Sequence, residues 1–285
     1  MTAMPRTLPK LTELRSGVRR LLAPNPSMMT GPGTNTYLFG EREIAVLDPG
    51  PLLVGHLEKI VEIAAAPIRW IIATHTHPDH SPGAAQLASM TGAELLGMPA
   101  PDGDHQDLTF RPTRQLGDGD ILRTPEFELE AIHTPGHASN HLCILHRASN
   151  WIFTGDHIID GSTVVINPPD GNMKAYLESL ARVRDLQPAA LLPGHGDKIT
   201  DPERVIDWII AHRLAREEKV LAAVLAASGS TVTELVPAVY ADVPQSLYPW
   251  AERSLLAHLI KLAEDGTILN QGERWLAAKK SGTVT

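Results

Sequence analysis

Three histidines and one aspartate lie within six residues of one another, at His75, His77, Asp79 and His80. Prolines within this motif prevent a helix, so the four side chains sit on a loop that follows the apolar residues 68–72, a predicted buried strand. Crowded imidazoles and carboxylates would repel or lack partners if buried, and a divalent cation removes both problems. The spacing favours two ions, with His75 and His77 facing one and Asp79 and His80 the other.

Four more segments have a similar arrangement, in which a short apolar run ends in a histidine or an aspartate. These residues are Asp48, His137, Asp156 and His195. Loops after strands meet at one end of a layered α/β fold, so we expect these side chains to gather around the 75–80 loop. A solvated polar loop with chance histidines is the alternative, but it does not account for the four further strand ends.

The elements that must position these residues alternate between strand and helix. This order is typical of an α/β domain, and residues 101–120, which are acidic and glycine-rich, are expected to be a solvated loop. The alternation of apolar and acidic residues at 127–132 is that of an exposed strand. We predict strands at 36–39, 44–47, 68–72, 94–96, 127–132, 151–153 and 189–192. We predict helices at 52–65 and 173–185, and another that begins at residue 84.

The composition changes after residue 200, where three helical stretches and a hairpin follow. Asp201 and Pro202 are the N-cap and first residue of a long helix to 227. Thr231 and Glu234 form a capping box for a second helix. We therefore predict a catalytic domain at 1–200 and a small winged-helix-like α+β domain at 201–285. The side chains expected to form its buried apolar face are Trp208, Trp250, Leu255, Leu256, Leu259 and Ile260.

Winged helices often bind DNA, so the charge of this segment matters. Residues 201–285 hold nine Lys/Arg and eleven Asp/Glu, a net charge of −2, whereas a helix that reads a DNA groove should be basic. We expect no binding to duplex DNA. Packing against the catalytic domain, shaping of its site, or formation of a homodimer are the remaining roles.

Composition excludes several classes of protein. The 285 residues carry a net charge of −8 and a single cysteine, Cys143, so no internal disulfide forms. No apolar run reaches 18 residues, so no membrane span is expected. The basic residues near the N-terminus are not followed by an apolar segment, so they do not form a secretory signal. We expect a soluble cytoplasmic protein.

The His-Thr-His-Pro-Asp-His motif, followed in order by His137, Asp156 and His195, resembles the metallo-β-lactamase superfamily over about residues 30–200. The resemblance implies an αββα sandwich with two metal ions at the edge of its sheets. It implies that Asp48 supports the metal loop from behind, while Asp79 orients the attacking water or carries its proton. The implied ligands are His75, His77 and His137 for the first ion, Asp79, His80 and His195 for the second, and Asp156 for both.

Hydrolysis is the chemistry that this resemblance implies. Two zinc ions about 3.5–4 Å apart share a hydroxide, because zinc lowers the pKa of bound water to about 7. The bridging hydroxide attacks a carbonyl carbon or a phosphorus, and no Ser or Cys nucleophile is needed. Iron or manganese are alternatives to zinc for the same ligands.

The resemblance extends to the β-lactamase-like protein 2 subgroup through residues 25–38, the helix around 211–217 and the winged-helix end. Because the animal member is an endoribonuclease, the first hypothesis is a phosphodiesterase that cleaves single-stranded RNA. The second is a glyoxalase II-like thioesterase or lactonase that acts on a small acyl substrate. The third is a metal-sensing regulator that binds nucleic acid.

Three histidines beside these motifs have no assigned ligand role. His133 and His141 flank the turn at 137 and are expected to make structural hydrogen bonds. His157 follows Asp156, and a contact with substrate is the less favoured of its two interpretations.

Overall fold

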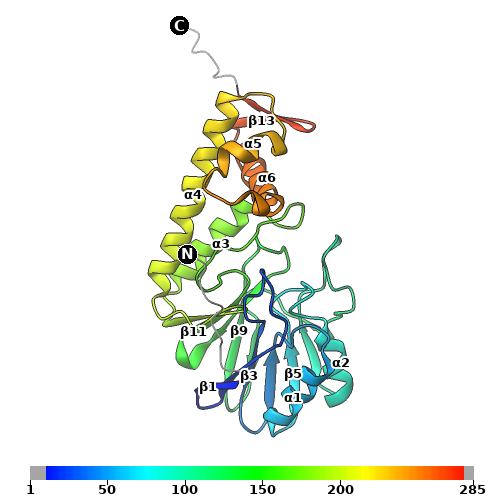
Figure 1. The fold of residues 1–285 in the computed structure, drawn as a ribbon. Helices are drawn as coiled ribbons and strands as arrows, with labels where there is room; N and C mark the ends of the chain where they lie inside the picture. Colours follow the sequence, from blue (N-terminus) through cyan, green and yellow to red (C-terminus); the bar gives the residue numbers. More distant parts are fainter. Residues whose placement is uncertain (1–10, 279–285) are drawn as a thin grey trace.

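The computed structural model describes residues 11–278, so the outer limits of the domains predicted at 1–200 and 201–285 lie outside the described residues. Two sheets pack face to face, helices cover the outer face of each, and a small helical domain lies at one end of this sandwich (Figure 1). The α/β class and the αββα arrangement are both confirmed.

The first sheet contains seven strands in sequence order. Its first four strands pair antiparallel, and β4 to β7 pair parallel. The strands are β1 (Leu11–Arg15), β2 (Val18–Leu22), β3 (Asn35–Phe39), β4 (Ile44–Leu47), β5 (Ile68–Ile72), β6 (Glu94–Gly97) and β7 (Arg114–Gln115).

The second sheet has five strands in the order β12-β11-β10-β9-β8. Only β11 and β12 pair parallel. The strands are β8 (Ile121–Arg123), β9 (Glu128–His133), β10 (Leu142–His146), β11 (Trp151–Gly155) and β12 (Ala190–Pro193), with the 3-10 turn η1 (Arg147–Ser149) after β10.

Alternating side chains of the strands build the layers of the core. In β4, Ala45 and Leu47 face the second sheet, while Ile44 and Val46 face α1 (Val54–Ala64) and α2 (Gly83–Thr91). This period of two is what an extended backbone imposes. On the other side, the outer face of the second sheet packs against α3 (Met173–Asp185) and the first half of α4 (Pro202–Ala226).

The C-terminal domain has a core of its own, formed by the second half of α4, α5 (Val232–Val239), α6 (Tyr248–Glu264) and the hairpin. The helix caps predicted at Asp201 and Thr231 are both present. The remaining elements are η2 (Gln245–Leu247), β13 (Ile268–Gln271) and β14 (Arg274–Ala277).

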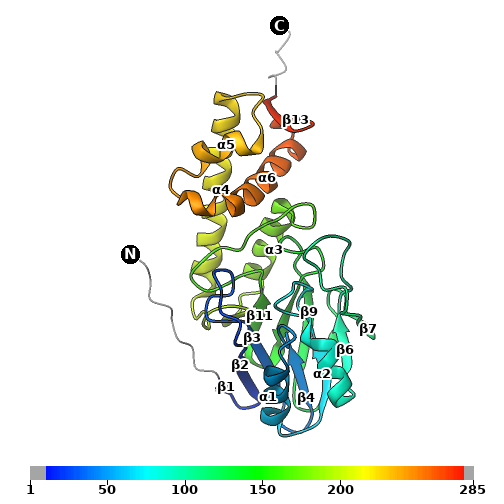
Figure 2. The same cartoon turned by 45° about the vertical axis from the view of Figure 1, so that its right-hand side comes forward.

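Helix α4 belongs to both parts of the molecule. Ile206 and Ile209 lie in the core of the sandwich, whereas Val220 and Val224 lie in the core of the C-terminal domain. Figure 2 shows this helix running from the sandwich to the C-terminal end. The domain limit at residue 200 therefore stays a prediction, because the helix that follows it packs on both sides.

Three local expectations differ from the structure. Five strands were not predicted, namely β1, β2, β7, β8 and β10; the residues before position 24, for example, show no clear pattern. Strand β9 is not exposed; it lies between β10 and β8, and its acidic side chains are only partly accessible. Trp208 and Trp250 are 49 % and 37 % exposed, whereas Leu255 and Leu259 are buried as expected. Helical spacing places residues on a face but does not say what covers that face.

No helix within residues 11–278 is long and apolar enough to cross a membrane. The predicted cytoplasmic location stays a prediction.

Because α4 joins both cores, we predict that Ile209→Ala destabilises the protein by about 2–5 kcal/mol, the usual cost of truncating a fully buried aliphatic side chain. The matched control is Leu225→Ala on the same helix, where the leucine is exposed and a change within about 0.5 kcal/mol is expected. Thermal unfolding measures both. Equal shifts for the two variants would contradict the packing role of the first half of α4.

Candidate metal centre

The structure brings the sequence-predicted site residues together at one end of the sandwich. Five strands end there: β4 is followed by Asp48, β5 by the 75–80 loop, β9 by His137, β11 by Asp156 and β12 by His195. The candidate ligand atoms form two groups, within each of which all atoms lie within 4.8 Å of one another: His75, His77 and His137; and Asp79, His80, Asp156 and His195.

In the first group, three imidazole nitrogens meet at one point. Nδ1 of His77 lies 3.0 Å from Nε2 of His75 and 3.0 Å from Nε2 of His137. Nitrogen ligands about 2.0–2.1 Å from a tetrahedral zinc ion would themselves be separated by about 3.3 Å. The spacing therefore suits a metal ion bound by three histidines.

In the second group, Nε2 of His195 lies 3.1 Å from Asp79 Oδ2 and 3.3 Å from Asp156 Oδ1. Nε2 of His80 lies 3.3 Å from the same Asp156 oxygen. The other oxygen of Asp156 faces the first group, 3.7 Å from Nε2 of His137. Asp156 thus presents one oxygen to each group.

In each imidazole ring, the hydrogen bond made by one nitrogen determines which nitrogen remains free to bind a metal ion. Nδ1 of His137 donates to the carbonyl of Val165 (2.8 Å), and Nδ1 of His195 donates to that of Gly33 (3.1 Å). A neutral ring that donates from Nδ1 has a lone pair on Nε2, and second-shell partners commonly orient metal-binding histidines in this way. In their neutral forms these rings therefore turn the Nε2 lone pairs toward one another, and a metal ion or, on His195, a proton would stabilise them.

Asp48 fixes two further rings. Its Oδ2 accepts hydrogen bonds from Thr74 Oγ1 (2.8 Å) and His80 Nδ1 (2.9 Å), and its Oδ1 accepts from the Thr74 amide (2.7 Å). Since the Thr74 hydroxyl gives its hydrogen to Asp48, His75 Nδ1 must donate to that hydroxyl (3.0 Å). The Asp48 backbone is left-handed, with φ of 50°, a conformation that Asp and Asn tolerate better than other side chains.

Two side chains of the second group each have a buried polar atom without a hydrogen-bond partner. These atoms are His80 Nε2 and Asp156 Oδ1. Unpaired buried polar atoms are costly, and a bound ion is one way to satisfy them. Gly194 leaves space beside them, because a Cβ there would lie 2.7 Å from His80 Cε1 and 2.9 Å from Asp156 Oδ1. The residues present thus fit a pair of divalent ions.

The two groups also differ in protonation. Burial and the neighbouring His137 lower the pKa of His77 to about 3. Burial acts in the same direction on His195, but Asp156 and Asp79 outweigh it and raise the pKa of His195 to about 10. A proton on His195 compensates for the carboxylates where a metal ion would do so, and metal binding there would release that proton.

The neighbouring histidines have structural positions. Nε2 of His141 accepts a hydrogen bond from the Asp156 amide (3.2 Å), and its Nδ1 pairs with Thr134 Oγ1 (2.9 Å). His133 pairs with the Ser139 carbonyl (2.8 Å). Both expectations are confirmed. His157 is fully buried against Tyr176, so the interpretation that it contacts substrate is wrong.

A cleft of about 740 Å³ opens beside the two groups. His77, Asp79, His137, Asp156 and His195 line its floor. Its other walls come from the loops at 28–32, 104–106 and 159–170, from α4, and from residues 240–254. The C-terminal domain therefore forms part of the wall of the candidate active site. Of the roles considered for this domain, shaping of the site is the one that the cleft supports.

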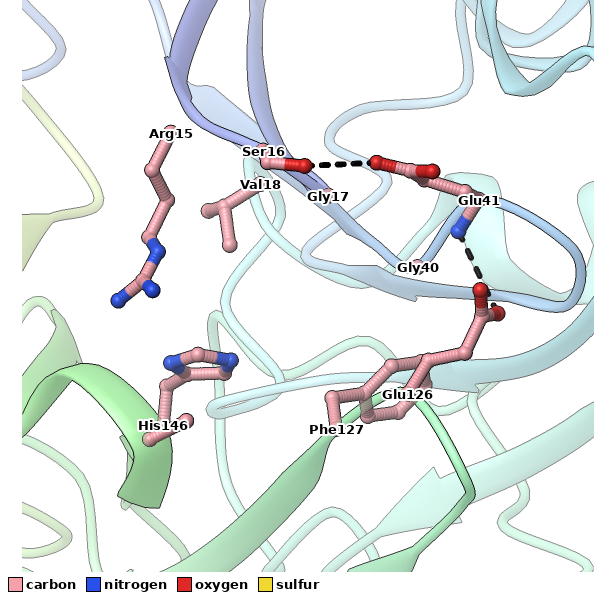
Figure 3. Close-up of a pocket in the computed structure, with 10 residues that line it drawn as sticks. Arg15, Ser16, Gly17, Val18, Gly40, Glu41, Glu126, Phe127 and His146 are labelled. Atoms are coloured by element: carbon pink, nitrogen blue, oxygen red, sulfur yellow. Dashed lines mark hydrogen bonds between the residues drawn. The ribbon is translucent and has the colours of Figure 1, made fainter.

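A second, smaller cavity of about 260 Å³ lies at the opposite end of the strands, between the β1–β2 turn and the start of β9 (Figure 3). Its polar groups largely satisfy each other: Ser16 donates to Glu41, and Glu126 accepts from the amides of residues 41–43. Within residues 11–278, the two groups of side chains that could hold a metal ion lie beside the larger cleft and not at this cavity.

Comparisons with known proteins agree with this geometry. Residues 29–195 match the family described as "Metallo-beta-lactamase superfamily", and residues 231–275 match "Beta-lactamase associated winged helix domain". The chain belongs to the metallo-β-lactamase superfamily. The winged helix predicted for the C-terminal segment is confirmed with it.

Individual relatives cover nearly the whole chain. It is 31 % identical to "Beta-lactamase-like protein 2 homolog" of Drosophila melanogaster, over 92 % of each sequence. It is also 31 % identical to "Atrochrysone carboxyl ACP thioesterase" of Aspergillus chevalieri, over 90 % of this chain and 84 % of the relative. A crystal structure of a β-lactamase domain protein from Burkholderia ambifaria superposes with a TM-score of 0.80 at 21 % identity, covering 95 % of each chain.

These matches confirm the resemblance to β-lactamase-like protein 2 proteins. Membership of the metallo-β-lactamase superfamily identifies the chain as a hydrolase, and its clusters of His and Asp are able to hold metal ions.

Sequence reasoning missed the residues that shape the cleft. Asp104, His105 and Gln106 lie in the loop predicted to be simply solvated, yet they line the cleft. Gln106 bonds to Thr76 within the metal loop (2.5 Å) and to Asp170 (3.1 Å). The pattern of this loop carries no signal of that role, because it depends on how distant loops meet.

We predict that Asp48→Asn weakens zinc binding about 10–100-fold, the usual effect of losing a second-shell partner. Asn tolerates the left-handed backbone, but it has only one accepting oxygen. Its NH2 group therefore faces either the Thr74 amide or the donors of Thr74 Oγ1 and His80 Nδ1. Chelator competition measures zinc affinity, and circular dichroism checks the fold. The control is Asp185→Asn at an exposed position. Unchanged zinc affinity in Asp48→Asn would remove Asp48 from the support of the metal loop.

Proposed function

We propose that this protein is a dinuclear zinc hydrolase that cleaves acyl thioesters or related acyl substrates in the cleft beside the two ligand groups. One ion would be held by His75, His77 and His137, and the other by Asp79, His80 and His195, with Asp156 available to both. The observation that carries the proposal is the convergence of the histidine Nε2 lone pairs on Asp156 at the floor of the cleft.

The bound ions would supply a Lewis acid for the substrate carbonyl and a water molecule acidic enough to react at neutral pH. The protein supplies the positions of these groups. Asp79 lines the cleft with its carboxylate held 3.1 Å from His195 Nε2, where it can orient water or accept its proton. Addition of water to a thioester carbonyl breaks the C–S bond and yields a carboxylic acid and a thiol.

The walls of the cleft support an acyl substrate. Apolar side chains line much of it: Met28, Met29, Ile159, Val164, Val165, Val243, Leu247 and Trp250. Apolar walls with a few polar groups are typical of small-molecule sites. A relative over nearly the whole chain is named as a thioesterase, which favours the same class of substrate.

The RNA phosphodiesterase, the first hypothesis from the sequence, takes second place. One observation favours it: Trp250, with the Arg253 guanidinium 4.7 Å from its ring, offers a partly exposed surface for stacking of a base. A groove for single-stranded RNA should also be cationic. The cleft instead places the carboxylates of Asp104, Asp160 and Asp170 among its arginines, so it is not cationic along its length.

A DNA-binding regulator is the least favoured of the three hypotheses. On α6, Lys261 is already paired with Glu217 (2.7 Å) and Asp265 (2.9 Å). A helix that neutralises DNA phosphates needs several accessible cations. We expect no salt-sensitive binding of duplex DNA in a gel-shift experiment.

We predict that zinc-loaded protein carries about two ions per chain and that Asp156→Ala retains about one or fewer while remaining folded, because Asp156 faces both groups. Elemental analysis after gel filtration gives the ratio. Asp102→Ala, at an exposed position, should bind as much zinc as the wild type. Absence of metal from wild-type protein loaded with zinc would reject the dinuclear site.

We predict that the zinc-loaded enzyme hydrolyses acyl thioesters faster than it cleaves a single-stranded oligoribonucleotide. The experiment compares kcat/KM for an acyl-thioester series, a lactone and an unstructured RNA. Asp79→Asn should lower kcat in the preferred reaction about 100-fold or more, as expected for loss of a group that transfers a proton. RNA cleavage that depends on zinc and Asp79, without thioester hydrolysis, would reverse the order of the two hypotheses.

A further inference from the structure

Arg213 is a buried cation in the wall of the cleft. It lies on α4, is only 3 % exposed, and lines the same cleft as the candidate metal ligands. Its Nη2 donates to the carbonyl of Val164, and its guanidinium lies 5.6 Å from the ring of Tyr176. Its Nε is buried without a hydrogen-bond partner.

The two other buried arginines differ from Arg213 in one respect. Arg20 is 3 % exposed and forms an ion pair with Asp197 (3.0 Å). Arg216 is 7 % exposed and forms one with Asp242 (2.9 Å). Among the residues that the structure describes, no carboxylate forms an ion pair with Arg213.

Burial of an uncompensated charge is costly, and arginine does not escape the cost by losing its proton. Buried charges are therefore usually paired. A carbonyl oxygen, the aromatic ring of Tyr176 and a hydrogen bond with the Tyr176 side chain are all uncharged partners, so they stabilise the Arg213 guanidinium only in part. An anion that enters from the cleft would complete its environment.

A second cation supports the same side of the cleft. Arg253 on α6 lines the cleft and contacts the Trp250 ring. Within residues 11–278 it also has no carboxylate partner. Arg213 comes from α4, the helix shared by both parts of the molecule, and Arg253 comes from the C-terminal domain. The candidate metal ligands come from the sandwich. The cleft thus has a cationic wall apart from its reactive floor.

We infer that Arg213, assisted by Arg253, anchors an anionic group of the substrate, a carboxylate or a phosphate, that is separate from the bond that is hydrolysed. This inference rests on the proposed hydrolase function. Guanidinium groups are well suited to carboxylates and phosphates. The wall formed by α4 and α6 then selects the substrate, while the floor performs the reaction.

Arg213 also has a structural contact that the experiment must separate from anchoring. It holds the carbonyl of Val164, and the next carbonyl, that of Val165, accepts from His137. Loss of Arg213 through this route would slow every substrate alike. Loss of an anchor would slow only substrates that carry the anion.

The experiment uses three thioesters with a similar reacting carbonyl. Butyryl-N-acetylcysteamine is uncharged, butyryl-coenzyme A carries phosphates on the thiol side, and glutaryl-N-acetylcysteamine carries a carboxylate on the acyl side. We expect Arg213→Met, in zinc-loaded full-length protein, to lower kcat/KM at least about tenfold for one charged substrate, the usual scale for a charged hydrogen bond. The uncharged substrate should change by less than about twofold, and the affected substrate tells carboxylate from phosphate.

Two further variants make the result decisive. Arg204→Met removes an exposed arginine from the same helix and should leave all three rates unchanged. Arg253→Met alters a partly accessible side chain and should lower the rate for the same charged substrate as Arg213→Met; it decides the question if Arg213→Met does not fold. Equal losses for all three substrates, or no loss for either charged one, would overturn the inference.

A binding experiment separates this inference from the proposed function. If the wild type hydrolyses none of the thioesters, calorimetry with adenosine 3′,5′-bisphosphate and with glutarate tests the anchor directly. Bound zinc contributes equally to the anion affinity of the wild type and of Arg253→Met. The difference between the two affinities therefore measures the contribution of the cationic wall. Weaker binding of one anion by the variant supports the anchor, and equal affinities, or no binding by the wild type, reject it.

Discussion

The candidate site depends on one electrostatic constraint, the convergence of imidazole lone pairs and carboxylate oxygens at the meeting point of two sheets. His75, His137 and His195 are each turned so that Nδ1 donates to a neighbour and Nε2 faces the others. Such an arrangement is unfavourable without a positive charge at its centre. The strands, the glycine beside His80 and the partners of each ring all serve to maintain it.

Much of this centre was predictable because its chemistry is local in sequence. The motif at 75–80 contains several candidate metal ligands within six residues. Each strand that ends in His or Asp can also be recognised from its own short segment. That they converge follows from the rule that strand ends of a layered fold share an edge. The caps at Asp201 and Thr231 were predictable for the same reason, since a cap depends on residues three positions apart.

The remainder depends on contacts between distant segments. Nothing around His105 indicates that its loop reaches the cleft, and nothing around Trp250 indicates that the side chain stays accessible. In the sequence, Arg213 resembles any other basic residue of a helix. Only the packing of α4 against the loop at Val164 shows that it is buried without an ion pair to any described carboxylate. Apolar periodicity predicts that a helix has an apolar face, but it does not predict which element packs against that face.

The continuity of α4 has a consequence for how the enzyme works. Ile209 is fixed in the core of the sandwich and Val220 in that of the C-terminal domain, with no break in the helix between them. A single helix anchored at both ends holds the two walls of the cleft at a set distance, as a rigid strut would. We therefore expect substrate entry and product release to involve the loops around the cleft, and not the hinged opening that a flexible linker between two domains would allow.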